Sequence, residues 1–155
     1  PGNEERKRSV RYKLVPQEFE ISGKDVLIVD DSIVRGNTSR QIVKMVKEFG
    51  AKNVYFISAC PPVKFPCYYG VDMPTRTELT AANKTNEEIR EFMGVDILMY
   101  QEVEDLKEAV TRKGEHNIDR PCMACLDGWY VTGDINEQVM ESMENQRINE
   151  RSLLK

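Results

Sequence analysis

The chain has 155 residues, of which 40% are hydrophobic and 31% are charged. These values are typical of one globular domain with a single core. The net charge of −4 argues against nonspecific binding of nucleic acid. No apolar run approaches the roughly 20 residues that a transmembrane helix needs, so we expect no membrane contact.

The N-terminal sequence and the cysteines favour a cytoplasmic protein. The N-terminus has no apolar segment of a secretory signal, and the missing initiator Met indicates a fragment or a processed chain. Four cysteines, two of them in a Cys-x-x-Cys motif, fit a metal or redox role in a reducing compartment better than a disulfide scaffold.

The first 20 residues are predicted to form a flexible basic loop. Residues 1–17 carry five basic and two acidic side chains, and Pro16 interrupts the only short apolar run. By composition alone a solvated linker is the better interpretation. A basic segment is also useful beside a polyanionic ligand.

The next part of the chain predicts a βαβ unit. Residues 26–29 are an apolar run that predicts a buried strand, and residues 39–49 repeat apolar side chains at helical spacing, with Asn37 or Thr38 as the cap. Residues 54–59 predict a second strand. A strand, a helix and a strand within about 35 residues predict parallel pairing with a right-handed crossover.

The second half predicts short helices and one more strand. Two capping-box sequences, Thr75-x-x-Glu78 and Thr85-x-x-Glu88, each predict a helix start. Residues 97–100 predict a strand, and a helix is expected over 102–113. Three further expectations are an irregular segment over 115–133, a last helix capped by Asp134 with Ile135, Val139, Met140 and Met143 on its buried side, and a frayed tail beyond Glu144.

The turn after the first strand has the chemistry to bind a sugar phosphate. Backbone N–H groups at a glycine-containing turn and a helix start receive phosphate, and the helix dipole adds about half a positive charge there. Asp30 and Asp31 at the strand end are suited to accept hydrogen bonds from sugar hydroxyls or to hold Mg²⁺. Because adjacent strand residues face opposite ways, they suit an acid–base pair less well.

The cysteines suggest a metal site that this chain does not complete. Cys122 and Cys125 are close enough in sequence to chelate one metal. Cys67 lies much earlier in the chain, in a proline-framed loop that could present it to the same metal. A zinc or iron–sulfur site needs a fourth ligand. Cys60 directly follows a predicted strand, so a buried structural thiol is the better interpretation for it.

The run from Val29 to Thr38 resembles the PRPP-binding loop of type I phosphoribosyltransferases, and in detail that of the amidophosphoribosyltransferase family. The resemblance covers nearly the whole chain. It implies an α/β fold, namely a partial type I phosphoribosyltransferase fold with a parallel sheet around a βαβ core plus C-terminal helices. Residues 1–20 are then the flexible loop, 21–113 the α/β core, 114–133 the cysteine-containing loop and 134–155 the C-terminal helix.

The resemblance also implies the ligands. The substrate-binding residues are expected to be Asp30, Asp31, Ser32, Ile33, Val34, Arg35, Gly36, Asn37, Thr38 and Ser39. Asp30 and Asp31 would hold Mg²⁺ or the ribose hydroxyls, and Cys67, Cys122 and Cys125 match ligands of a [4Fe-4S] cluster whose remaining ligand lies upstream of this chain.

Members of the family make 5-phosphoribosylamine from PRPP and glutamine-derived ammonia, releasing pyrophosphate, in the first step of de novo purine synthesis. The resemblance therefore implies a homo-oligomeric parent enzyme with purine nucleotides as inhibitors. The resemblance also implies that the N-terminal glutaminase domain is not part of these 155 residues, so the fragment alone is expected to be inactive.

Three rival interpretations remain open. The first is a PRPP- or nucleotide-sensing regulatory module without catalysis, and the second is a salvage phosphoribosyltransferase. The third is a receiver domain, which would need an aspartate after the next strand, where this chain has Ala59 and Cys60.

Overall fold

The computed structural model describes residues 15–112 and 118–153. Within them, three parallel strands form one sheet in the order β1 (Asp25–Asp30), β2 (Asn53–Ser58) and β3 (Ile97–Tyr100). Val26 of β1 aligns with Val54 of β2, and Tyr55 aligns with Ile97 of β3. The predicted parallel βαβ unit is confirmed.

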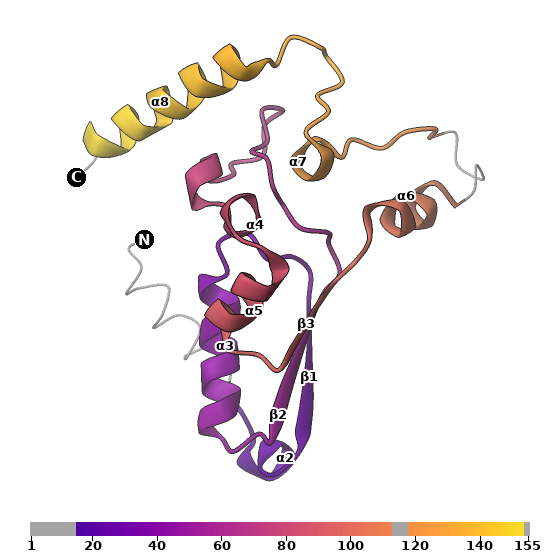
Figure 1. Ribbon diagram of the computed structural model, residues 1–155, viewed down its shortest axis with the longest axis vertical. Helices are drawn as coiled ribbons and strands as arrows, with labels where there is room; N and C mark the ends of the chain where they lie inside the picture. Colours follow the sequence, from indigo (N-terminus) through magenta and orange to yellow (C-terminus); the bar gives the residue numbers. More distant parts are fainter. Residues whose placement is uncertain (1–14, 113–117, 154–155) are drawn as a thin grey trace.

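The helices differ in length and in their contacts. In chain order they are α2 (Glu18–Ile21), α3 (Asn37–Glu48), the 3-10 helix η1 (Arg76–Glu78), α4 (Thr80–Asn83), α5 (Asn86–Met93), α6 (Val103–Thr111), α7 (Ala124–Asp127) and α8 (Glu137–Leu153). Figure 1 shows α3 and α5 side by side along one side of the sheet, whereas α8 extends away from it at the far end of the molecule. No helix among the described residues is long and apolar enough to cross a membrane.

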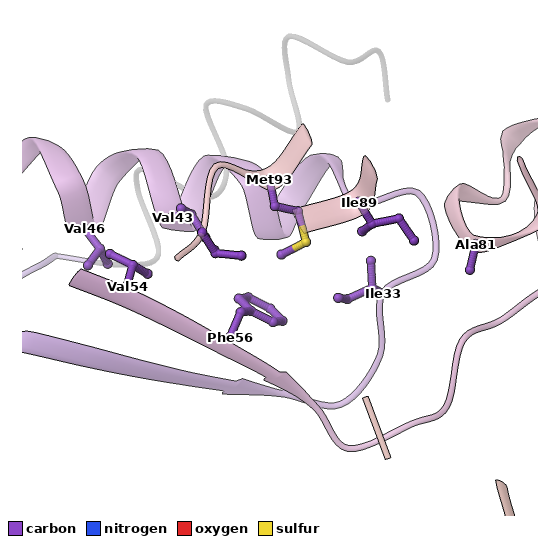
Figure 2. Close-up of a cluster of buried hydrophobic side chains, with 9 residues drawn as sticks. Ile33, Val43, Val46, Val54, Phe56, Ala81, Ile89 and Met93 are labelled. Atoms are coloured by element: carbon purple, nitrogen blue, oxygen red, sulfur yellow. The ribbon is translucent and has the colours of Figure 1, made fainter. Parts of the chain in front are cut away.

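The main core lies between the sheet and the α3–α5 layer. Phe56 and Val54 of β2 are fully buried against Val43 of α3 and Ile89 of α5, and Figure 2 shows their side chains pointing toward one another. Ile33, from the turn that follows β1, enters the same cluster and is 1% exposed. The turn is therefore anchored in the core by its own side chain.

The opposite face of the sheet is bare within the described residues. Its central rows are apolar: Leu27 aligns with Tyr55 and Ile97, and Val29 aligns with Ile57 and Met99. The side chains on β1 and β3 are between 49% and 64% exposed. This face, defined by these six residues, is called the bare face below.

A second apolar cluster lies beyond the carboxyl ends of the strands. Leu79, Val63, Met123 and Leu126 are buried there, and Val103 and Leu106 of α6 pack against them. The cluster joins the 61–79 segment to α7. The backbone N–H groups of Lys64 and Phe65 strengthen this junction, because both donate hydrogen bonds to the carbonyl of Cys125. The cysteine-bearing part is thus packed onto the α/β core.

Several sequence-based boundaries were wrong. The cap of α3 is Gly36 rather than Asn37 or Thr38, and α6 ends at Thr111 with Arg112 in a left-handed conformation (φ 45°). The segment expected to be irregular contains α7, and α2 was not predicted. The tail beyond Glu144 does not fray, because α8 continues to Leu153.

The apolar side chains of the last helix are less buried than the sequence predicted. Ile135, Val139 and Met140 are only half-buried and Met143 is exposed. Polar contacts hold α8 instead: Glu144 accepts a hydrogen bond from the backbone N–H of Arg76 at 2.8 Å, and Arg147 donates one to the carbonyl of Met73 at 2.6 Å. Most of the flexible loop expected over residues 1–20 lies outside the described residues.

Candidate functional site

The candidate site is the turn between β1 and α3, at the carboxyl edge of the sheet. The ends of all three strands meet there, because the N–H of Ala59 bonds to the carbonyl of Asp30 and the N–H of Gln101 bonds to that of Ser58. In open parallel sheets, ligands bind in the crevice outside this edge. The predicted site thus occupies the position where the fold favours a ligand.

Asp30 and Asp31 lie side by side but in different surroundings. Asp30 is the last residue of β1 and is half-buried, and its Oδ1 accepts a hydrogen bond from the N–H of Asp31 at 3.0 Å. Asp31 is exposed, and its Oδ1 accepts from the hydroxyl of Ser32 at 2.7 Å. Each carboxylate retains a second oxygen with which to bind a sugar hydroxyl or a hydrated cation.

The start of α3 supplies the phosphate-binding chemistry. Gly36 caps the helix with φ 70°, a conformation that favours glycine, and its carbonyl accepts the N–H of Arg40 at 2.9 Å. The N–H groups of the first helical residues lack intrahelical partners and point out of the helix end. Asn37 and Thr38 are exposed beside them, whereas Ser39 is 3% exposed and faces the core. A phosphate at this end gains both amide hydrogen bonds and the helix dipole.

Two contacts to the Thr75–Thr80 segment hold the turn from outside. The carbonyl of Val34 accepts the N–H of Thr80 at 2.9 Å, and Nη2 of Arg35 donates to Oε1 of Glu78 at 2.8 Å. Sequence reasoning missed both partners. The capping box indicated a structural role for Glu78, but no sequence signal showed that its second oxygen reaches a residue 43 positions away.

The cysteines lie near one another without forming a metal site. Among the described residues, no group of three or more His, Cys, Asp or Glu side chains is placed to hold a metal ion. Burial raises the pKa of the Cys125 thiol, and the neighbouring thiols of Cys60, Cys67 and Cys122 raise it further. The iron–sulfur role of Cys67, Cys122 and Cys125 therefore stays a prediction.

Cys60 is the fourth thiol of this group. It is half-buried against the second apolar cluster, which agrees with a structural role. Burial raises its pKa, and the Asp31 carboxylate raises it further. Both effects disfavour the thiolate, which is the form that binds metals.

Comparison with known proteins finds amidophosphoribosyltransferases. The amidophosphoribosyltransferase of Pseudomonas aeruginosa is 50% identical over 147 residues, which is 95% of this chain and 29% of the relative. That of Methanocaldococcus jannaschii is 48% identical over 132 residues, covering 85% of this chain and 27% of the relative. Over most of its own length the chain is thus similar to amidophosphoribosyltransferases, of which it spans under a third. No protein-family model matches it.

Solved structures of amidophosphoribosyltransferases agree with the fold. The glutamine PRPP amidotransferase of Bacillus subtilis, complexed with ADP and GMP, superimposes with a TM-score of 0.67 at 40% identity and covers 80% of this chain and 28% of that one. A structure described as the allosteric regulatory enzyme of purine biosynthesis gives a TM-score of 0.69 at 36% identity and covers 88% of this chain and 30% of that one. The parallel sheet is part of a type I phosphoribosyltransferase fold, and the chain spans under a third of its relatives' length.

Proposed function

We propose that this chain is the C-terminal portion of the phosphoribosyltransferase domain of an amidophosphoribosyltransferase and holds the ribose 5-phosphate half of PRPP. The observation that carries the proposal is the turn over residues 30–39, which lies at the carboxyl edge of the sheet and opens α3. In this role Asp30 and Asp31 bind the ribose hydroxyls or Mg²⁺, and residues 33–39 bind the phosphate. The similarity to amidophosphoribosyltransferases supports it.

The whole reaction converts PRPP and glutamine-derived ammonia into 5-phosphoribosylamine and pyrophosphate. In this proposal the chain positions the ribose 5-phosphate part of PRPP and stabilises charge electrostatically. Stabilisation is needed because the departure of pyrophosphate leaves an electron-poor centre at the ribose. A Mg²⁺ ion, when bound, offsets phosphate charge, and carboxylates such as Asp30 and Asp31 are the oxygen ligands it prefers. The domain division over residues 1–20, 21–113, 114–133 and 134–155 belongs to the same proposal.

The bare face supports the idea that more polypeptide belongs to this domain. Parallel sheets normally bury both faces. The relatives are more than three times as long as this chain, so they contain the residues to cover such a face. In the same parent, an upstream cysteine would complete the iron–sulfur ligands begun by Cys67, Cys122 and Cys125. All four cysteines of the described chain are free, in keeping with a cytoplasmic setting.

Purine nucleotides are the second class of ligand that we propose. A nucleoside monophosphate carries the same 5′-phosphate and ribose as PRPP, so the same turn is expected to receive it. The support is that the Bacillus subtilis relative was solved with ADP and GMP. Displacement of ribose 5-phosphate by GMP in calorimetry would agree with a shared site, and simultaneous independent binding would contradict it.

The test of the proposed function is a titration of the 155-residue chain with ribose 5-phosphate in the presence of Mg²⁺. Saturable heat is expected, with backbone amide shifts at residues 33–39 in NMR spectra. Changing both Asp30 and Asp31 to Asn is expected to weaken binding at least tenfold, since two charge-assisted contacts are lost. Shifts confined to another region would reject the site.

Activity gives a separate test. With glutamine, PRPP and Mg²⁺, the chain alone is expected to release neither glutamate nor pyrophosphate above background, because it spans only part of its relatives. Sustained release of both products would reject the assignment of the chain as a non-catalytic portion.

A further inference from the structure

We propose that Glu78 is a positioning residue for the phosphate-binding turn and acts through Arg35. The proposal rests on the proposed function of that turn, since it concerns how the turn is kept in a binding-competent shape. It assigns the Arg35 guanidinium to an anchor of the turn.

The carboxylate of Glu78 is bound at both of its oxygens. Oε2 accepts hydrogen bonds from the backbone N–H and the hydroxyl of Thr75, each at 3.1 Å, while Oε1 accepts Nη2 of Arg35 at 2.8 Å. The first pair fixes the carboxylate to its own helix start. The second contact then transfers that fixed position to the turn, 43 residues earlier in the chain.

The surroundings favour a strong contact. The side chains of Arg35 and Glu78 are only 28% and 34% exposed, so water and salt compete less with this pair than with the fully exposed pairs of the surface. The 2.8 Å distance is typical of a charge-assisted hydrogen bond. Thr75, the other partner of the carboxylate, is 3% exposed.

The turn is held on both sides of Arg35. The preceding residue, Val34, accepts the N–H of Thr80 through its carbonyl. The following residue, Gly36, lies so close to α5 that a Cβ there would be 3.2 Å from the ring of Phe92. Glu78 therefore adds a side-chain contact between these two backbone restraints and limits the rotation of the peptide groups of the turn.

The chain contains a matched control for this inference. Glu88 occupies the same place in the second capping box and accepts hydrogen bonds from the N–H and the hydroxyl of Thr85, at 2.7 and 2.9 Å. Glutamine is tolerated at this position of a capping box. Glu78→Gln and Glu88→Gln are thus equivalent for the helix starts, and only Glu78→Gln removes the carboxylate that binds Arg35.

The experiment measures ribose 5-phosphate affinity and amide hydrogen exchange of residues 33–38 in the 155-residue chain. Glu78→Gln is expected to weaken binding about tenfold and to speed exchange of the turn amides, since a charged hydrogen bond is lost. Glu88→Gln is expected to change neither. Equal effects of the two variants would overturn the proposal.

A double-mutant cycle separates positioning from a general loss of stability. Arg35→Met and Glu78→Gln are expected to be non-additive in both readouts, the double variant being no worse than Arg35→Met alone. Additive effects would overturn the proposal. If the unsubstituted 155-residue chain fails to bind ribose 5-phosphate, the proposed function fails. Hydrogen exchange of the turn amides in the ligand-free variants still decides the role of Glu78.

Discussion

The two faces of the sheet have the same kind of side chain but opposite surroundings. On the covered face, Phe56 and Val54 are completely buried beneath α3 and α5, whereas on the bare face Leu27, Val29 and Met99 remain more than half exposed. Apolar character alone therefore does not create a core. The covered face also anchors the candidate site, because Ile33 inserts the turn between β1 and α3 into it.

The difference shows which parts of the molecule are structurally self-sufficient. The turn, α3 and α5 are held to the sheet by contacts within the described chain. The bare face has six aligned apolar side chains on a parallel sheet, of which the four on β1 and β3 are exposed, an arrangement that globular proteins normally cover.

Truncation of one central side chain on each face gives the largest contrast. Phe56→Ala is expected to lower the free energy of unfolding by about 3–5 kcal/mol, because it opens a cavity in the core. Leu27→Ala, at a position 56% exposed, is expected to cost about 0.5 kcal/mol or less. Urea denaturation of the two variants checks this, and a similar loss for Leu27→Ala would show that the bare face is buried in solution.

A substitution at Gly36 tests how closely α5 packs against the turn. Gly36→Ala is expected to cost about 2 kcal/mol, because a left-handed backbone is combined with a Cβ 3.2 Å from Phe92. Gly94→Ala is the control, since Gly94 has a similar φ of 74° but no atom within 4 Å of the added Cβ, and about 1 kcal/mol is expected. Thermal unfolding measures both, and equal losses would mean that Phe92 moves aside without cost.

Tyr100 gives a smaller effect with a pH dependence. Its hydroxyl is buried on the covered side without a hydrogen-bond partner among the described residues, and burial raises its pKa to about 12. The neutral phenol therefore contributes its full stability below pH 10, and this contribution is lost as the pH rises from 10 to 12. Tyr100→Phe is expected to reduce this alkaline loss and to raise stability at pH 7 by about 1 kcal/mol, because a buried polar group is removed.

The check on Tyr100 is a set of urea titrations from pH 7 to 12. Tyr68→Phe serves as a comparison, since burial also raises the pKa of Tyr68 and its hydroxyl likewise lacks a partner among the described residues. An unchanged alkaline slope in Tyr100→Phe would show that the hydroxyl is solvated.

Charged residues on the bare face should have the smallest effect on stability. Leu27→Lys together with Met99→Lys is expected to change the free energy of unfolding of the 155-residue chain by less than about 0.5 kcal/mol. The same pair should sharply reduce the fluorescence of a dye that binds exposed apolar surface. In a longer polypeptide that covers the face, the pair should destabilise instead, because two charges would be buried.

The sequence predicts the frame of the fold well because its signals are local. The apolar run at Val26–Val29, the helical spacing after Ser39 and the Thr85-x-x-Glu88 box each produce the expected element. The apolar run over residues 26–29 indicated a buried strand, and the structure covers only one face of it. That outcome depends on what lies above the sheet, which no property of β1 encodes.

What could not be predicted depends on contacts between distant segments. The cap Gly36 lies close to Phe92 of α5, and α8 is bound through Arg76 and Arg147 to segments more than 60 residues away. The residues of the turn were identified from their own chemistry, and their binding roles remain predictions. Its anchor, Glu78, was not identified, since ion pairs across 43 residues leave no periodic signal.

The polar contacts of α8 connect the C-terminal helix to the segment that carries Glu78. Glu144 and Glu137 hold Arg76, which is two residues from Glu78. Deleting this helix would therefore loosen the seat of the carboxylate that steadies Arg35, although no residue of the turn is altered. A protease that trims the C-terminus would then weaken, from a distance, the sugar-phosphate binding proposed for the turn.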